Sequence, residues 1–255
     1  MIPIDLCICL SGPLVDVLLP ITMETLRRND ALEGVTLHFV DKDCTPAVKR
    51  YLLDSGAKVH EFTSPKRFKP TAIAQTAEQD IERDVVNGTV TTLNWMWKTC
   101  GTNEWVFIMH FDLEFKTPWL SYLRNLIAPS VGQIGDHACG LVGYNRTALQ
   151  QAEVGFNCMW NFFVVRDHYG NWKLRHEKDL RCTDHSMPFH GFDTNELLEL
   201  NLQHWGWQVI TETDVESNKW RVHNGAGSGR CPESNQMIRE RALVRLRELR
   251  IQPIT

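Results

Sequence analysis

The stretch Trp105-Val-Phe-Ile-Met-His-Phe111, followed at once by Asp112-Leu113-Glu114, decides the fold. A nearly continuous apolar run of this length is typical of a strand that is buried on both faces, as in the middle of a parallel sheet. In open α/β sheets, ligands bind beyond the carboxyl ends of the strands. The stretch therefore predicts both a central strand and, directly after it, a candidate site.

Strands and helices alternate on either side of this stretch. Apolar runs that end in turn residues predict strands, and apolar residues at helical spacing predict helices, with Pro20 marking a kink or a helix start. The expected strands cover residues 4–10, 35–40, 57–62 and 162–165, and the expected helices cover residues 15–29, 46–55, 119–127 and most of 71–100. This alternation indicates an α/β fold with a mostly parallel central sheet that is covered on both faces. Because no internal repeat or clear linker is present, we expect one domain over residues 1–235.

Composition and charge exclude several classes of protein. The chain has 255 residues, with 27 Lys and Arg against 31 Asp and Glu, and the resulting net charge of −4 disfavours a nucleic-acid partner. No apolar run approaches the roughly 20 residues that span a bilayer, and residues 1–5 lack the basic region of a signal peptide. We therefore expect a cytoplasmic protein, and we expect its eight cysteines to be reduced and mostly buried.

Two acidic clusters follow predicted strands. Asp112 and Glu114 lie two positions apart on an extended segment, so both carboxylates can point to the same side. Such a pair of oxygen ligands suits Mg²⁺ or Mn²⁺ held jointly with substrate phosphates, although a solvated loop edge would also explain it. The second cluster, Asp41-Lys42-Asp43, directly follows the strand expected at 35–40.

The segment His190-Gly-Phe-Asp193-Thr-Asn-Glu196 opens a predicted helix and allows two interpretations. Asp193 followed three positions later by Glu196 has the pattern of a capping box, which stabilises a helix start in any protein. Alternatively, Asp193 or Glu196 serves as a general base toward an attacking hydroxyl.

His223 stands before a run of small residues, from Asn224 to Gly229. A histidine followed by a glycine-rich loop can complete a metal site and let backbone amides approach phosphates, but the same pattern also describes a plain turn after a strand.

Taken in order, these segments resemble the GT-A fold glycosyltransferases, and most closely their family 2-like group. The resemblance covers residues 4–230 and implies a three-layer α/β/α sandwich, with a nucleotide-binding half over 1–115 and an acceptor half over 116–235. It implies an enzyme that moves a sugar from a UDP- or GDP-sugar to a hydroxyl of a glycan or lipid-linked acceptor, with inversion of configuration. The residues that it places at the nucleotide are Ser11, Asp41, Asp43, Asn94 and Asp112.

The resemblance also assigns the metal and the base. In this family an Asp-X-Asp motif holds Mn²⁺ or Mg²⁺. The corresponding ligands here are Asp112, Glu114 and the late histidine His223. The family's Glu-Asp pair at the helix start falls near Thr194-Asn195 in this sequence, so we prefer Asp193 over Glu196 as the base.

Two other functions stay open. A nucleotidyltransferase can be built on a similar sheet, but that class usually carries a basic, glycine-rich loop after the first strand, and Ser11-Gly12-Pro13-Leu14 has no Lys or Arg. A catalytically inactive carbohydrate-binding module is the second alternative. Substitution of Asp112 separates these alternatives, since only an enzyme should lose turnover.

The C-terminal residues 236–255 predict a basic amphipathic helix. Ile238, Ala242, Leu246 and Leu249 form one apolar stripe. Such a stripe usually packs on its own domain, but it can also serve a homodimer or peripheral contact with an anionic membrane.

Overall fold

The structure, a computed structural model, describes residues 2–63, 92–136, 140–151, 162–166, 172–176, 196–211, 221–224 and 232–255. Within these ranges the centre of the molecule is a seven-stranded sheet in the order β10-β6-β7-β4-β1-β2-β3. Its strands are β1 (Ile4–Leu10), β2 (Val35–Asp41), β3 (Lys58–Glu61), β4 (Trp105–Met109), β6 (Val131–Asp136), β7 (Leu141–Asn145) and β10 (Gln208–Ile210). Only β7 runs antiparallel to its neighbours, which confirms the α/β class with a mostly parallel sheet.

Two short ladders and a set of helices complete the described part. The ladders pair β5 (Leu113–Phe115) with β11 (Arg221–His223), and β8 (Phe162–Arg166) with β9 (Trp172–His176). The helices are α1 (Val15–Asn29), α2 (Pro46–Asp54), a helix over 92–99, α4 (Trp119–Asn125), α5 (Arg146–Gln151), α6 (Glu196–His204) and α8 (Pro232–Leu249). The expected strands at 4–10 and 162–165 and the helix starting at Pro46 are confirmed, with bounds that agree within one residue.

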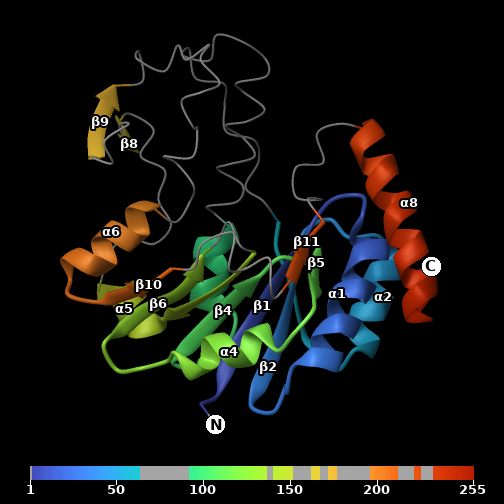
Figure 1. Cartoon of the computed structure of the whole chain (residues 1–255), viewed down its shortest axis with the longest axis horizontal. Helices are drawn as coiled ribbons and strands as arrows, with labels where there is room; N and C mark the ends of the chain where they lie inside the picture. Colours follow the sequence, from blue (N-terminus) through green and yellow to red (C-terminus); the bar gives the residue numbers. More distant parts are fainter. Residues whose placement is uncertain are drawn as a thin grey trace.

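The sheet separates two hydrophobic cores, which gives three layers (Figure 1). On one face, α1, α2, α4 and α8 contribute to a large core that includes Leu6, Ile8 and Phe107. On the other face, the helix over 92–99 packs with residues of α5 and α6 on Val106 and Ile108. Because side chains alternate along a strand, neighbouring residues of β1 and β4 supply the two cores in turn, as the uninterrupted apolar runs predict.

Pro20 lies inside α1 and does not mark the start of that helix. Because proline has no backbone N–H, the carbonyl of Asp16 loses its partner within the helix. The N–H of Ile254, near the end of the chain, donates to that carbonyl oxygen at 2.9 Å. The C-terminal segment therefore satisfies an acceptor that the proline leaves open.

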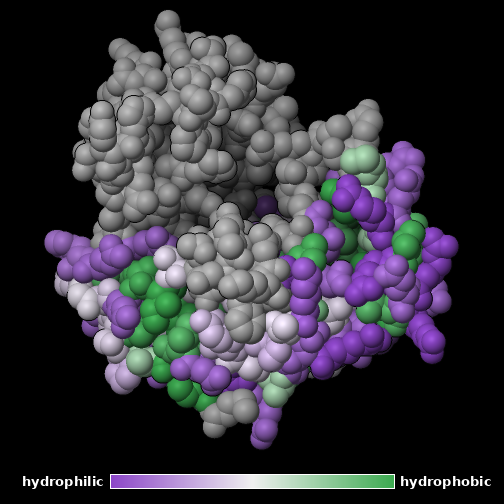
Figure 2. All heavy atoms as spheres, viewed as in Figure 1, coloured by the Kyte–Doolittle hydropathy of each residue, from purple (hydrophilic) through white to green (hydrophobic). Residues whose placement is uncertain are grey.

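The C-terminal helix α8 packs on α1, and its apolar stripe lies in the large core. It begins at Pro232 and ends at Leu249, so the expectation of a helix up to residue 255 is wrong for the last six residues; Arg250 takes a left-handed conformation, with φ of 60°. Figure 2 shows a mainly hydrophilic surface over this helix, with isolated hydrophobic residues. Met237 and Val244 are the large apolar side chains exposed there.

None of the helices in the described ranges combines the length and the apolar composition needed to cross a bilayer. The cysteines in these ranges, Cys7, Cys9, Cys44 and Cys100, are free thiols, as expected.

Candidate active site

The segment Asp112-Leu113-Glu114 leaves the central sheet. Strand β4 ends at Met109, earlier than the apolar run suggested, and the chain turns through Phe111 and Asp112 into the short strand β5. The N–H of His110 donates to the Gly140 carbonyl at 2.7 Å as the chain leaves the sheet. The acidic motif therefore lies in a separate ladder of its own, beyond the carboxyl end of a buried strand.

One edge of β5 is paired with β11. His223 stands opposite Leu113, between the positions of Asp112 and Glu114 on the partner strand. Asn224 donates twice to the Asp112 carbonyl oxygen, from its backbone N–H at 2.9 Å and from Nδ2 at 3.1 Å. The ladder thus brings the backbone of His223 beside the acidic motif, which lies more than 100 positions earlier in the chain. Because opposite residues of a ladder share a face and neighbours alternate, the position of His223 falls on the face of Leu113, and that of Glu114 on the other face.

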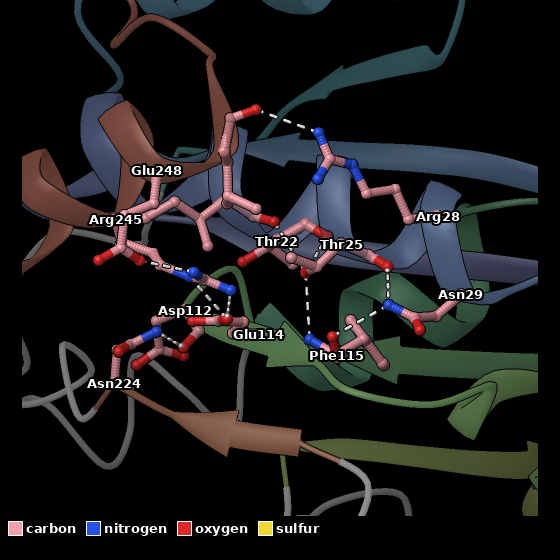
Figure 3. A network of polar contacts seen from close by, with 12 residues as sticks. Thr22, Thr25, Arg28, Asn29, Asp112, Glu114, Phe115, Asn224, Arg245 and Glu248 are labelled. Carbon is pink, nitrogen blue, oxygen red and sulfur yellow. Dashed lines mark hydrogen bonds and ion pairs between the residues drawn. The ribbon is translucent and has the colours of Figure 1, made fainter.

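Side chains of α1 satisfy the other edge of β5 (Figure 3). Thr22 Oγ1 lies 2.7 Å from the Leu113 carbonyl oxygen, and Thr25 Oγ1 accepts the Phe115 N–H at 3.1 Å. Asn29 Nδ2 donates to the Phe115 carbonyl oxygen at 3.0 Å. In place of another strand, polar side chains of a mostly buried helix complete the hydrogen bonding of β5, so the acidic motif is fixed from both edges.

Glu114 is paired with an arginine of the C-terminal helix. Its Oε1 accepts hydrogen bonds from Arg245 Nη2 at 2.6 Å and Nε at 2.8 Å, and Arg245 Nη1 also binds Glu248 at 2.6 Å. The carboxylates of Glu114 and Glu248 raise the pKa of Arg245. A cation at Glu114 Oε1 would therefore have to share or displace this guanidinium.

The two carboxylates fit Mn²⁺ or Mg²⁺, since Asp112 and Glu114 supply the oxygen ligands that these ions prefer. The register puts His223 opposite Leu113, and so does not by itself add an imidazole to this pair. Asp112 is 1% exposed, and Glu114 keeps 16% of its side chain exposed. The backbone that carries these groups is anchored by four residues of other elements, and a metal site needs such support.

The second acidic cluster lies at the same edge of the sheet, where Leu10 of β1 and Asp41 of β2 stand side by side. Asp41 is buried, and its oxygens accept the Cys44 N–H at 2.8 Å and Lys49 Nζ at 3.0 Å. Burial alone would raise the pKa of Asp41, but these two donors hold it below the usual value. Asp43, by contrast, is exposed and sits at a φ of 66°.

The other predicted nucleotide contacts are placed differently. Ser11 is exposed directly after β1, at the same edge as Asp41. Asn94 belongs to the helix over 92–99, on the other face of the sheet from α1, and its Oδ1 accepts a hydrogen bond from Trp97 Nε1 at 3.4 Å. The structure thus groups Ser11, Asp41 and Asp43 at one edge and puts Asn94 beneath the opposite face.

The structure does not describe the side chains of the two predicted bases, Asp193 and Glu196. Asp193 lies outside the described residues, and Glu196 is placed only as the first residue of α6. Both the capping interpretation and the catalytic one therefore remain predictions.

Sequence reasoning missed the residues that position the motif. Thr22, Thr25 and Asn29 recur on one side of a helix whose other residues are mainly apolar, and this polar stripe, in which both threonines are buried, was a readable signal. For Arg245, one of several arginines in a basic helix, the sequence carries no signal that would single it out.

No family model matches the chain, and no curated protein matches it. Solved structures are similar at low identity. They include a mannosyltransferase, PcManGT, from Pyrobaculum calidifontis in complex with GDP-Man and Mn²⁺, with a TM-score of 0.49, 12% identity, and coverage of 83% of this chain and 55% of that one. Mouse xyloside xylosyltransferase 1 in its apo form is similar with a TM-score of 0.38 and 14% identity, and the match covers 59% of this chain and 69% of that one. The glycosyltransferase GlyE of Streptococcus pneumoniae TIGR4 has a TM-score of 0.44, 12% identity and coverage of 100% and 54%.

The chain thus spans 55% of the length of the mannosyltransferase. These likenesses are too distant to carry an activity or the role of a residue over to this chain.

Proposed function

We propose that the chain is a metal-dependent glycosyltransferase that moves a sugar from a nucleoside-diphosphate sugar to an acceptor hydroxyl. The observation that carries the proposal is the position of the Asp112-Leu113-Glu114 motif, directly beyond the carboxyl end of β4 and held by β11 on one edge and α1 on the other. The motif order described above supports the same reading, since the family that it resembles uses these positions for a cation and the donor diphosphate.

In this proposal Asp112 and Glu114 hold Mn²⁺ or Mg²⁺, and His223, which stands opposite Leu113, would join the metal or the donor phosphates. When bound, the cation neutralises charge that develops on the departing nucleoside diphosphate. Asn224 and Thr22 keep the backbone of the motif in place, and Arg245 balances the charge of Glu114. Rigid placement matters because electrostatic stabilisation depends on groups that need no reorganisation during the reaction.

The nucleoside half of the donor would bind at the edge formed by the ends of β1 and β2. One Asp41 oxygen accepts the Cys44 N–H in the turn and the other pairs with Lys49 of α2, so Asp41 contributes by fixing the turn that presents Asp43. Ser11 and Asp43 are exposed at this edge and can reach the ribose or the base. Asn94 would contribute from the helix over 92–99.

Asp193 would accept the proton of the acceptor hydroxyl, with Glu196 as the alternative base. We further propose inversion at the anomeric carbon, UDP or GDP as the nucleotide, and a glycan or lipid-linked acceptor.

The free thiols of the described cysteines are typical of a reducing compartment and support a cytoplasmic location. Because the apolar stripe of α8 is used inside the domain, a homodimer or membrane contact would have to use its outer face, where Met237 and Val244 are exposed.

The test is a screen with the purified protein and Mn²⁺, followed by mass spectrometry. One arm offers sugar nucleotides, and a parallel arm offers nucleoside triphosphates together with sugar phosphates. A glycosyltransferase releases a nucleoside diphosphate from one donor, by transfer or by slow hydrolysis. A nucleotidyltransferase would instead release pyrophosphate from a nucleoside triphosphate and a sugar phosphate, and a binding module would release neither product. Either of these outcomes would contradict the proposal.

A further inference from the structure

A second cluster of metal-ligating side chains lies beneath the other face of the sheet. His38 on β2, His60 on β3 and Cys100 after the helix over 92–99 each offer one ligand atom, and these atoms lie within 4.8 Å of one another. It is the only such group of three His, Cys, Asp or Glu side chains in the ranges that the structure describes. His38 and Cys100 are fully buried, and His60 is partly buried.

The strand register explains why the two histidines meet. His60 stands opposite Val40, which is two positions along β2 from His38, so both imidazoles lie on the same face. His38 Nδ1 and His60 Nε2 are 2.9 Å apart. Cys7 stands opposite His38 on β1 and therefore shares this face, and its thiol donates to the Cys100 carbonyl at 4.0 Å.

The orientation of His38 is set by a buried carboxylate. His38 Nε2 lies 3.1 Å from Asp5 Oδ1, and because an ionised carboxylate can only accept, we assign the ring proton to Nε2. The lone pair of Nδ1 then points toward His60. Asp5 is itself held by the N–H and Nδ2 of Asn103, each at 2.9 Å, and by Arg146 at 3.1 Å. A carboxylate behind a histidine is the usual second layer of protein metal sites.

The surroundings shift the pKa values of the cluster in two directions. Burial, His38 and Lys58 lower the pKa of His60. Cys100 and burial raise the pKa of Cys7 well above its usual value, so a metal would have to displace the proton of this thiol. Burial alone would raise the pKa of Asp5, but His38, Asn103 and Arg146 outweigh it and hold the pKa below its usual value.

We propose that His38, His60 and Cys100 bind Zn²⁺, with Cys7 placed to supply a fourth ligand. A mixed set of imidazole and thiolate donors selects Zn²⁺ over the oxygen-seeking Mg²⁺ and Mn²⁺. Tetrahedral Zn²⁺ with ordinary bond lengths sets its ligand atoms about 3.3–3.8 Å apart, with the nitrogen pair at the short end, so the two histidine nitrogens need to open by about 0.4 Å. The ion would join β2, β3 and the end of the helix over 92–99, a structural role independent of the proposed transferase site.

The main test measures zinc bound to the purified full chain by elemental mass spectrometry, after incubation with Zn²⁺ and removal of the excess. We expect about one ion per chain in the wild type. Cys100→Ser and His60→Gln should each lose it, with affinity at least about tenfold weaker. Cys44→Ser is the matched control, because Cys44 is a partly buried free thiol that packs on the opposite face of the sheet. Asp112→Asn should also keep the zinc, which separates this site from the acidic motif.

A second readout needs no variant. Co²⁺ replaces Zn²⁺ in such sites, and a thiolate ligand adds a charge-transfer band to the Co²⁺ spectrum of the wild-type protein. The proposal is overturned if the wild type takes up neither ion or shows no thiolate band. It is also overturned if Cys100→Ser and His60→Gln both fold and retain the zinc, or if Asp112→Asn alone abolishes uptake.

Discussion

Glu114 of strand β5 and Arg245 of helix α8 form a two-bonded ion pair, with Oε1 receiving both guanidinium hydrogen bonds at 2.6 and 2.8 Å. The carboxylate that the sequence proposed as a metal ligand is thus in contact with the C-terminal helix. The pair is partly exposed, at 38% for Arg245 and 16% for Glu114, so solvent weakens it. A cation and Arg245 compete for the same oxygen.

Arg245→Ala should therefore strengthen metal binding. Removal of a competing pair worth up to about 1 kcal/mol lowers the Mn²⁺ dissociation constant by up to about fivefold. The free energy of unfolding should fall by less than about 1 kcal/mol. Mn²⁺ titration by calorimetry and urea unfolding measure the two effects.

Arg247→Ala is the matched control, because Arg247 lies on the same helix and donates to the Leu243 carbonyl. It should leave Mn²⁺ affinity unchanged. If Arg245→Ala weakens Mn²⁺ binding instead, Glu114 does not act as a ligand in competition with the arginine.

Thr25→Val should loosen the acidic motif. The substitution keeps the shape of the side chain but removes the acceptor of the Phe115 N–H, and an unsatisfied buried group costs about 1–3 kcal/mol. Urea unfolding should show this loss, and turnover should fall because β5 carries Glu114. Thr36→Val, the same change on the partly buried start of β2, should alter stability by less than about 0.5 kcal/mol. Equal stability of the two variants would contradict the role assigned to Thr25.

Asp41→Asn tests the turn at the end of β2. The native pKa of Asp41 lies below its usual value, so its charge stabilises the fold above the ordinary carboxyl range near pH 4, and this contribution is lost as the pH falls. Asn keeps an acceptor for the Cys44 N–H but loses the charge, which should cost about 1 kcal/mol at pH 7. Unfolding measured from pH 7 to 3 should show the gap between the two proteins closing toward low pH.

Asp43→Asn is the control for this series. Asp43 is exposed, and asparagine tolerates its left-handed backbone, so the stability of this variant should parallel that of the wild type at every pH. A gap between Asp41→Asn and the wild type that widens toward low pH would show that the Asp41 charge does not stabilise the fold.

Asp193→Asn should abolish transfer and leave donor affinity near that of the wild type. A general base contributes about 10²–10⁴-fold to the rate, whereas it adds little to binding of the donor nucleotide. The measurements are turnover with the donor found in the screen, and calorimetric titration of the same donor. Full activity in Asp193→Asn, together with an inactive Glu196→Gln, would move the role to Glu196.

Local patterns were sufficient for much of the fold. The apolar run of β1 and the sequence around α2 agree with the structure because each element carries its own signals, such as Thr45 capping α2 and Gly56 after it with φ of 72°. The antiparallel strand β7 was not foreseen, since direction within a sheet depends on partners far away in the chain. In the structure, Gly143 of β7 lies under the ring of Phe107, where a Cβ atom would come within 2.5 Å.

In the candidate site, too, local patterns predict some features and leave out others. The clusters at the ends of β2 and β4 follow from strand patterns, because a strand end can be read from the sequence around it. The pairing of Arg245 with Glu114, and of Ile254 with the carbonyl that Pro20 leaves open, joins residues more than 100 positions apart. No local pattern specifies such contacts, since they depend on where a distant helix docks.

The measurement that tests the central claim most directly is calorimetric titration of the wild type and Asp112→Asn with UDP- and GDP-sugars, with and without Mn²⁺. We predict that the wild type binds one nucleotide series only when Mn²⁺ is present, and that Asp112→Asn, while folded, binds it at least about tenfold more weakly. Absence of nucleotide binding in both series, or equal Mn²⁺-dependent binding by the two proteins, would contradict the proposed transferase site.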